Sequence, residues 1–124
     1  MTYLSPLSAA LEGTGQSIDF SGKWVNELSS TMDVIQNGTV LTGTYFSAVS
    51  GGSSSTTGAL QGSVDGALIA FVVHWNDFQA STAWVGHLDS GTGSIATLWQ
   101  MTSASEPGAE WSSINAGADT FTRA

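Results

Sequence analysis

Residues 71–87 read FVVHWNDFQASTAWVGH, and this stretch decides the fold class. Side chains two residues apart lie on the same face of a β-strand, and the large side chains here recur with that period. Phe71, Val73 and Trp75 share one face before a polar turn, and Thr82 and Trp84 share one face after it. The pattern predicts two antiparallel strands joined by a short link.

The same period of two recurs from Phe20 to the end of the chain, and turn signals such as Asn37-Gly38 and Asp65-Gly66 separate the segments. We expect strands near residues 20–28, 30–36, 39–49, 58–64, 67–75, 81–89, 94–102 and 115–123. Loops of small or turn-forming residues are expected at 50–58 and 103–110, with a short helical turn at 111–113.

Eight sequential strands with tight turns predict an all-β fold, an eight-stranded antiparallel up-and-down barrel, because closing the meander removes its exposed edges. A barrel of this size has room for its own side chains and one small ligand. Residues 1–19 contain Pro6, Gly13 and Gly15, and they predict an irregular arm before a barrel domain at residues 20–124.

The composition excludes several classes of partner. The formal net charge is −8, and Lys23 and Arg123 are the only lysine and arginine residues. Nucleic acids and anionic lipids need a basic face, so we expect neither as a partner. The absence of cysteine excludes disulfides and thiolate metal sites. Residues 1–19 do not resemble a signal peptide, so we expect either a cytosolic protein or a secreted or periplasmic one whose signal preceded Met1.

The predicted inward faces mix large apolar side chains with polar ones. They hold Trp24, Asn26 and Leu28 in the first strand, Tyr45, Ser47 and Val49 in the third, Thr82 and Trp84 in the sixth, Thr97, Trp99 and Met101 in the seventh, and Asp119 and Phe121 in the eighth. A plain barrel core does not need these polar groups, because a buried group without a partner costs about 1–3 kcal/mol. We therefore expect a pocket that binds a small polar ligand.

Five motifs in this order resemble the avidin/streptavidin family over residues 20–123: GKWVNELSST (22–31), LTGTYFSAV (41–49), Trp75 followed by STAW (81–84), TLWQMTS (97–103) and ADTFT (118–122). The resemblance implies an eight-stranded barrel that binds biotin at its open end without catalysis and without a cofactor. It also implies biotin and biotinylated molecules as partners, and association with copies of the same chain, with a tetramer favoured and a dimer possible.

The resemblance assigns roles to individual residues. It implies donors to the ureido oxygen of biotin at Asn26, Ser30 and Tyr45, and acceptors for the ureido N–H groups at Ser47 and Asp119. The other implied contacts are a hydroxyl facing the ring sulfur and a set of apolar walls, namely Leu28, Val49, Trp75, Thr82, Trp84, Trp99 and Met101. Trp24 is expected in the core at the closed end of the barrel instead.

Three further positions concern the rim of the pocket. Trp111 matches a tryptophan that a neighbouring subunit inserts over the ligand, which implies at least two subunits. The polar residue that would hold the valerate carboxylate falls on Gly51 by a gapless count, and Ala80 stands where a serine is expected. The resemblance therefore implies that Gly51 contacts the ligand, but with weaker contacts to the tail and an affinity below that of the tightest relatives.

Two alternatives stay open on the sequence. One is a lipocalin-type barrel for another small apolar or ureido-like ligand, and the other is a structural oligomer whose inward polar groups pair with each other. An enzyme is not expected, because no nucleophile–base pair or metal set emerges. His74 and His87 should face outward by parity, which leaves Ser30 without a base and either histidine without a third metal ligand.

Overall fold

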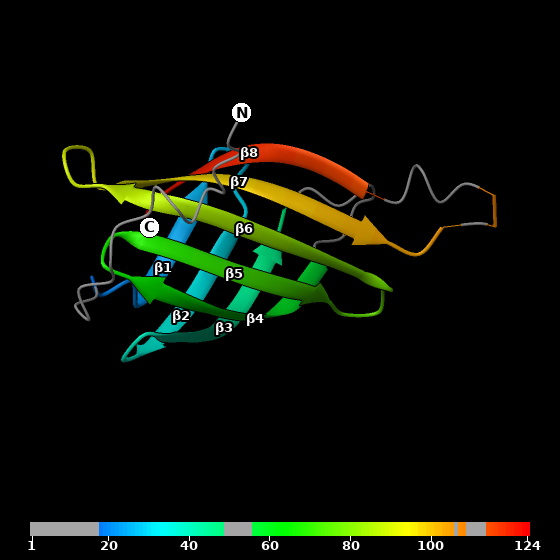
Figure 1. Cartoon of the computed structure of the whole chain (residues 1–124), viewed down its shortest axis with the longest axis horizontal. Helices are drawn as coiled ribbons and strands as arrows, with labels where there is room; N and C mark the ends of the chain where they lie inside the picture. Colours follow the sequence, from blue (N-terminus) through cyan, green and yellow to red (C-terminus); the bar gives the residue numbers. More distant parts are fainter. Residues whose placement is uncertain (1–17, 49–55, 106, 109–113) are drawn as a thin grey trace, which may run out of the picture.

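The computed structural model describes residues 18–48, 56–105, 107–108 and 114–124. In these ranges it contains eight strands: β1 (Gly22–Asn26), β2 (Thr31–Asn37), β3 (Val40–Ser47), β4 (Thr56–Asp65), β5 (Leu68–Trp75), β6 (Ala80–Asp89), β7 (Ser94–Ser103) and β8 (Ile114–Arg123). Each strand pairs antiparallel with the next, and β8 pairs with β1 to close the barrel (Figure 1). The predicted eight-stranded antiparallel barrel is confirmed. Within the described residues no helix is long and apolar enough to cross a membrane.

The strand bounds agree with the sequence prediction to within one residue except at the two ends of β1, the end of β3 and the start of β4, where β1 begins at Gly22 and not at residue 20 and β3 ends at Ser47 and not at residue 49; two of these differences concern the site. The first is the start of β4, where Thr56 and Thr57 pair with Ser47 and Phe46 of β3, although residues 50–58 were expected to form a loop. A run of small hydroxyl residues carries little periodic signal, so only the ladder reveals the strand. The predicted arm up to residue 17 and the helical turn at 111–113 lie outside the described residues.

The second difference is the end of β1, which stops at Asn26 and not at residue 28. Here the chain turns, and Ser29 adopts a left-handed conformation with φ of 69°. The side-chain oxygen of Asn26 accepts the backbone N–H groups of Leu28 at 3.0 Å and Ser30 at 2.9 Å. An asparagine side chain that bonds the backbone ahead of it is typical of such a turn.

The barrel has two unlike ends. The turns β2–β3, β4–β5 and β6–β7 gather at one end, which we call the closed end, and the last residues of β1, β3, β5 and β7 lie at the other, the open end (Figure 1). At the closed end Phe20 is fully buried, its N–H donates to Gln36 Oε1 at 2.8 Å, and its carbonyl accepts the Trp24 indole N–H at 2.9 Å. The Arg123 guanidinium lies 4.2 Å from the centre of the Trp24 ring. These contacts fill the closed end with side chains, and Trp24 belongs to the core as predicted.

Candidate functional site

A cavity of about 300 Å³ opens at the open end of the barrel. Eleven residues line it: Asn26, Leu28, Ser30, Tyr45, Ser47, Trp75, Thr82, Trp84, Trp99, Met101 and Asp119. These are all the residues that the sequence assigns to the site within the described ranges, and Val49, Gly51 and Trp111 lie outside those ranges. The period-two faces of six strands and the β1–β2 turn therefore converge on one space.

Asn26, Ser30 and Tyr45 form a cluster of hydrogen-bond donors on one side of the cavity. The Asn26 amide N–H donates to the Tyr45 hydroxyl at 3.3 Å, and its oxygen is occupied by the two backbone N–H groups of the turn. The Ser30 hydroxyl oxygen accepts the backbone N–H of Ala48 at 2.9 Å. Because the side-chain oxygens of Asn26 and Ser30 accept backbone N–H groups, these side chains act as donors to their other neighbours, Asn26 to Tyr45 and Asp119 and Ser30 to Tyr45.

The electrostatics keep Tyr45 a neutral donor. Its side chain is buried, and burial raises the pKa of the hydroxyl well above its ordinary value, with a further increase from the negative charge of Asp119. The ring is held by an edge-on contact with Trp75, at a centroid distance of 5.4 Å, and by stacking on Trp84 at 4.8 Å. The Tyr45 O–H is thus fixed in position and protonated at every physiological pH.

Asp119 supplies an acceptor next to this cluster, because β8 pairs with β1 and the Asn26 side chain bonds to its carboxyl. Its side chain is 8% exposed, and its Oδ2 accepts the Trp84 indole N–H at 2.9 Å. Burial raises the pKa of the Asp119 carboxyl, the Trp84 hydrogen bond opposes that shift, and the nearby negative charge of Glu27 raises the pKa further. Glu27 itself is exposed and accepts the backbone N–H of Thr120 at 3.1 Å. A like charge therefore lies next to the acceptor of the site.

The tryptophans line the cavity in different ways. Trp84 stacks on Phe71 at a centroid distance of 4.9 Å as well as on Tyr45, which fixes the plane from which its N–H reaches Asp119. Trp75 donates its indole N–H to the Thr82 hydroxyl at 2.9 Å. The supporting role of Phe71 was not predicted, because nothing in the local sequence pattern shows which inward rings meet across strands.

Trp99 depends on a glycine of the neighbouring strand. It pairs with Gly117 of β8, and a Cβ atom at Gly117 would lie 2.5 Å from Cζ2 of the indole. Real Cβ atoms do not approach so closely, so the indole lies over the position that a side chain would occupy. Trp99 is only partly buried, and it packs against the hydrophobic core as well as over Gly117.

The polar groups of the site are more completely paired than the sequence suggested. Among the described residues every fully buried side-chain nitrogen and oxygen has a hydrogen-bond partner in the protein. The expectation that these groups lack partners without a ligand is therefore not met by the structure. A ligand in the cavity would take over hydrogen bonds that Asn26 and Ser30 now make to Tyr45 and Asp119, and would meet the Tyr45 hydroxyl and the Asp119 carboxylate.

A second chamber, which we call the vestibule, adjoins the cavity. Its volume is about 310 Å³ and its lining is Ser47, Thr56, Trp75, Phe78, Ala80, Met101 and Ser103. Three of these residues, Ser47, Trp75 and Met101, also line the cavity, so the two spaces are neighbours. Thr56, Phe78 and Ser103 were not predicted as site residues, because they lie in or beside links where periodicity gives no direction.

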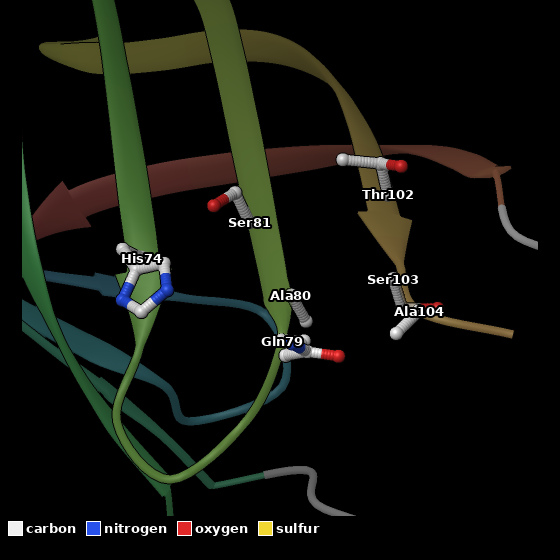
Figure 2. Close-up of a pocket in the computed structure, with 7 residues that line it drawn as sticks. All are labelled: His74, Gln79, Ala80, Ser81, Thr102, Ser103 and Ala104. Atoms are coloured by element: carbon white, nitrogen blue, oxygen red, sulfur yellow. The ribbon is translucent and has the colours of Figure 1, made fainter.

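A groove on the outer surface lies between the ends of β5, β6 and β7, and it shares Ala80 and Ser103 with the vestibule (Figure 2). His74 and Ser81 line it from β5 and β6, and both belong to the outward faces of their strands. His74 and His87 are exposed, as their parity predicts. No group of three metal-ligating side chains occurs among the described residues.

Comparison with known proteins agrees with this geometry. The model of the avidin family matches residues 14–124. Avidin of Gallus gallus is 29% identical over 133 residues, which cover 94% of this chain and 88% of avidin. Avidin-related protein 4/5 of Gallus gallus is 26% identical over 121 residues, which cover 89% of this chain and 81% of that protein.

Solved structures give the same result for the fold. The crystal structure of xenavidin superposes with a TM-score of 0.75 at 29% identity and covers 88% of this chain and 100% of xenavidin. The crystal structure of apo shwanavidin superposes with a TM-score of 0.70 at 28% identity, with the same shares covered. The chain therefore belongs to the avidin family, whose members are non-catalytic binding proteins.

Proposed function

We propose that the protein binds biotin, without covalent chemistry, in the cavity at the open end. The observation that carries the proposal is the convergence of a donor cluster and a carboxylate on one cavity of about 300 Å³. A cyclic urea has the opposite pattern, with one strongly accepting oxygen and two N–H donors. Asn26, Ser30 and Tyr45 match the oxygen, and Ser47 and Asp119 match the N–H groups.

The geometry supports tight binding for a physical reason. Hydrogen bonds in a site with a low dielectric constant are strengthened, and bonds that share one polarisable group strengthen each other. Asp119 accepts a hydrogen bond from a ureido N–H and polarises the ureido group, which increases the negative charge on its oxygen. The three donors stabilise that negative charge. These side chains are held before the ligand arrives, because Asn26 accepts the backbone N–H of Ser30 and Ser30 accepts that of Ala48 just after β3, so little ordering is needed on binding.

The two alternatives explain less. A generic apolar ligand would exclude water from the donor cluster without offering it a hydrogen-bond acceptor. Binding such a ligand therefore costs free energy for each donor that is left without a partner. A purely structural barrel agrees with the pairing of Trp75 with Thr82 and of Trp84 with Asp119. A structural barrel, however, has no need of a cleft at its open end in which Asn26, Ser30 and Asp119 lie beside three tryptophans.

A thermal-shift experiment tests the proposal. Biotin should raise the melting temperature strongly, because a ligand at 1,000 times its dissociation constant adds about 4 kcal/mol to the free energy of unfolding. Pentanoic acid, which has the tail but no ureido ring, is the control and should leave the melting temperature unchanged. Asp119→Ala should weaken biotin binding by more than about 1–3 kcal/mol, the scale of a buried hydrogen bond that is not made. A melting temperature that biotin leaves unchanged would exclude the proposal.

We further propose that copies of the chain associate through the outer face of β5–β8. Ala70, Val85, Leu98 and Ala118 lie directly opposite one another across these four strands. Val85 is 57% exposed and Leu98 66% exposed, so the row is an apolar surface open to solvent. Contiguous apolar surface on a soluble protein is typical of an interface with another protein. This proposal includes the role expected for Trp111, which would cover the cavity of a neighbouring copy. Trp111 itself lies outside the described residues.

A further inference from the structure

Thr97 is a buried polar residue that the proposed site does not use. It belongs to the inward face of β7 and is 4% exposed, but it does not line the cavity. Its hydroxyl donates to the backbone carbonyl of Asp119 at 2.9 Å, and the two residues are direct partners across β7 and β8. Thr97 therefore contacts the main chain of the residue that supplies the carboxylate to the cavity, although it does not face the cavity itself.

The hydrogen bond from Thr97 falls where β8 separates from β1. The pairing of β1 with β8 ends at Phe121, and among the described residues the only strand partner of Asp119 is Thr97 in β7. The peptide group that joins Asp119 to Thr120 is nevertheless held on both sides, because Thr97 donates to its carbonyl and Glu27 accepts its N–H at 3.1 Å. Side chains thus provide at this point the hydrogen bonds that a neighbouring strand provides elsewhere in the barrel.

A glycine of β6 sets the orientation of the Thr97 side chain. Thr97 pairs with Gly86, and a Cβ atom at Gly86 would lie 2.7 Å from Cγ2 of Thr97. The Thr97 methyl group therefore occupies space that a glycine leaves free. A β-branched side chain has few χ1 rotamers, so a methyl group placed toward β6 leaves the hydroxyl on the side of β8. Packing thus directs the hydroxyl to the Asp119 carbonyl before any ligand is present.

We propose that Thr97 is a positioning residue of the biotin site, an inference that rests on the proposed function. It holds the main chain of Asp119 so that the carboxylate keeps its angle to the cavity. The Asp119 side chain is short, so a shift of its main chain moves the carboxylate relative to the Trp84 indole N–H, which it accepts at 2.9 Å, and relative to an N–H of the ligand. Hydrogen bonds weaken steeply as their angle departs from linear, so a small shift weakens both bonds.

Thr97→Val tests the inference, because it keeps the shape of the side chain and removes the donor. We expect the dissociation constant for biotin to rise about tenfold, the scale of one buried hydrogen bond. In an Asp119→Ala background the same substitution should change it by less than about twofold, because a residue that acts through another has no effect once the other is removed. Thr97→Ser keeps the hydroxyl and should retain most of the affinity. An equal loss with and without Asp119 would overturn the inference, since it would show a general effect on the barrel.

Hydrogen exchange in the ligand-free protein gives a second readout. In Thr97→Val the indole N–H of Trp84, followed by NMR, should exchange faster, because the Asp119 carboxylate is its acceptor. The Trp24 indole N–H, which is bonded at the closed end, is the internal control and should not change. Thr102→Val, on the exposed face of β7, is the matched variant and should leave the exchange at Trp84 and the biotin affinity unchanged.

The two readouts separate a failure of this inference from a failure of the proposed function. If the unmodified protein does not bind biotin, the proposed function fails, and the exchange at Trp84 still decides whether Thr97 positions Asp119. An exchange rate at Trp84 that Thr97→Val leaves unchanged would overturn the inference whether or not biotin binds. Thr97→Ala removes the same donor without placing a second methyl group next to the carbonyl, and it should give the same result if Thr97→Val does not fold.

Discussion

At the scale of single residues, Asp119 combines a function with a cost to the ligand-free fold. Burial and Glu27 raise the pKa of its carboxyl, so folding favours the protonated form. The protonated Asp119 carboxyl contributes fully to the free energy of unfolding below its ordinary pKa near 3.8. This contribution is lost as the pH rises through the raised pKa of the folded protein. Ligand-free protein with Asp119→Asn, which has no charge to bury, should therefore melt higher than the unmodified protein at pH 7. The difference should vanish near pH 3.5 in melts followed by circular dichroism, and an equal difference at both pH values would contradict the assignment.

After burial, Glu27 is the next cause that raises the pKa of Asp119, so it should shift the pH at which ligand binding weakens. An N–H of the ligand favours the charged form of Asp119, so biotin affinity should fall as the pH drops below the raised pKa of the free protein. Glu27→Gln removes the like charge but keeps an oxygen for the Thr120 N–H, and it should move this fall to a lower pH. Titration calorimetry from pH 4 to pH 8 measures the shift. Coincident profiles for Glu27→Gln and the unmodified protein would show that the two carboxyl groups do not interact.

At the scale of strands, the contact between β7 and β8 positions one wall of the cavity. Gly117→Ala would place a Cβ atom 2.5 Å from the Trp99 ring, so the indole must move. We expect biotin affinity to fall about tenfold or more, while the melting temperature of the ligand-free protein changes little because Trp99 is only partly buried. Fluorescence quenching by biotin measures the first effect and a thermal melt the second. Unchanged affinity would mean that Trp99 does not contact the ligand.

The strands also show how far the sequence alone can reach. Period-two parity was sufficient to predict that Asn26, Tyr45 and Asp119 face one interior, and the structure places all three at the cavity. Parity carries no information about register, which decides that Trp84 stacks on Phe71 and bonds to Asp119. Parity also gives no side-chain direction for residues in the links between strands. The vestibule residues Thr56, Phe78 and Ser103 become neighbours only when three hairpins meet at one end of the barrel.

At the scale of the whole molecule, the apolar outer face of β5–β8 should control assembly. Leu98→Lys puts a charge at the centre of the row, where its burial against a second copy would be costly. We expect light scattering to report a smaller species than for the unmodified protein. Ile35→Lys, on the outer face of β2 and equally exposed at 66%, is the matched control and should leave the mass unchanged. An unchanged mass for Leu98→Lys would place the interface elsewhere.

The last residue of the chain lies at the end of the barrel away from the cavity. The backbone N–H of Ala124 donates to the carbonyl of Lys23 at 3.0 Å, next to the contact between Arg123 and Trp24 at that end. A sensor surface or fusion partner coupled at Ala124 would consequently hold the barrel by its base and leave the ligand entrance pointing into solution. Coupling through the β5–β6 hairpin would instead bring the support against Phe78 and obstruct the passage. The orientation of immobilisation is thus determined by the topology, without any engineering of the binding residues.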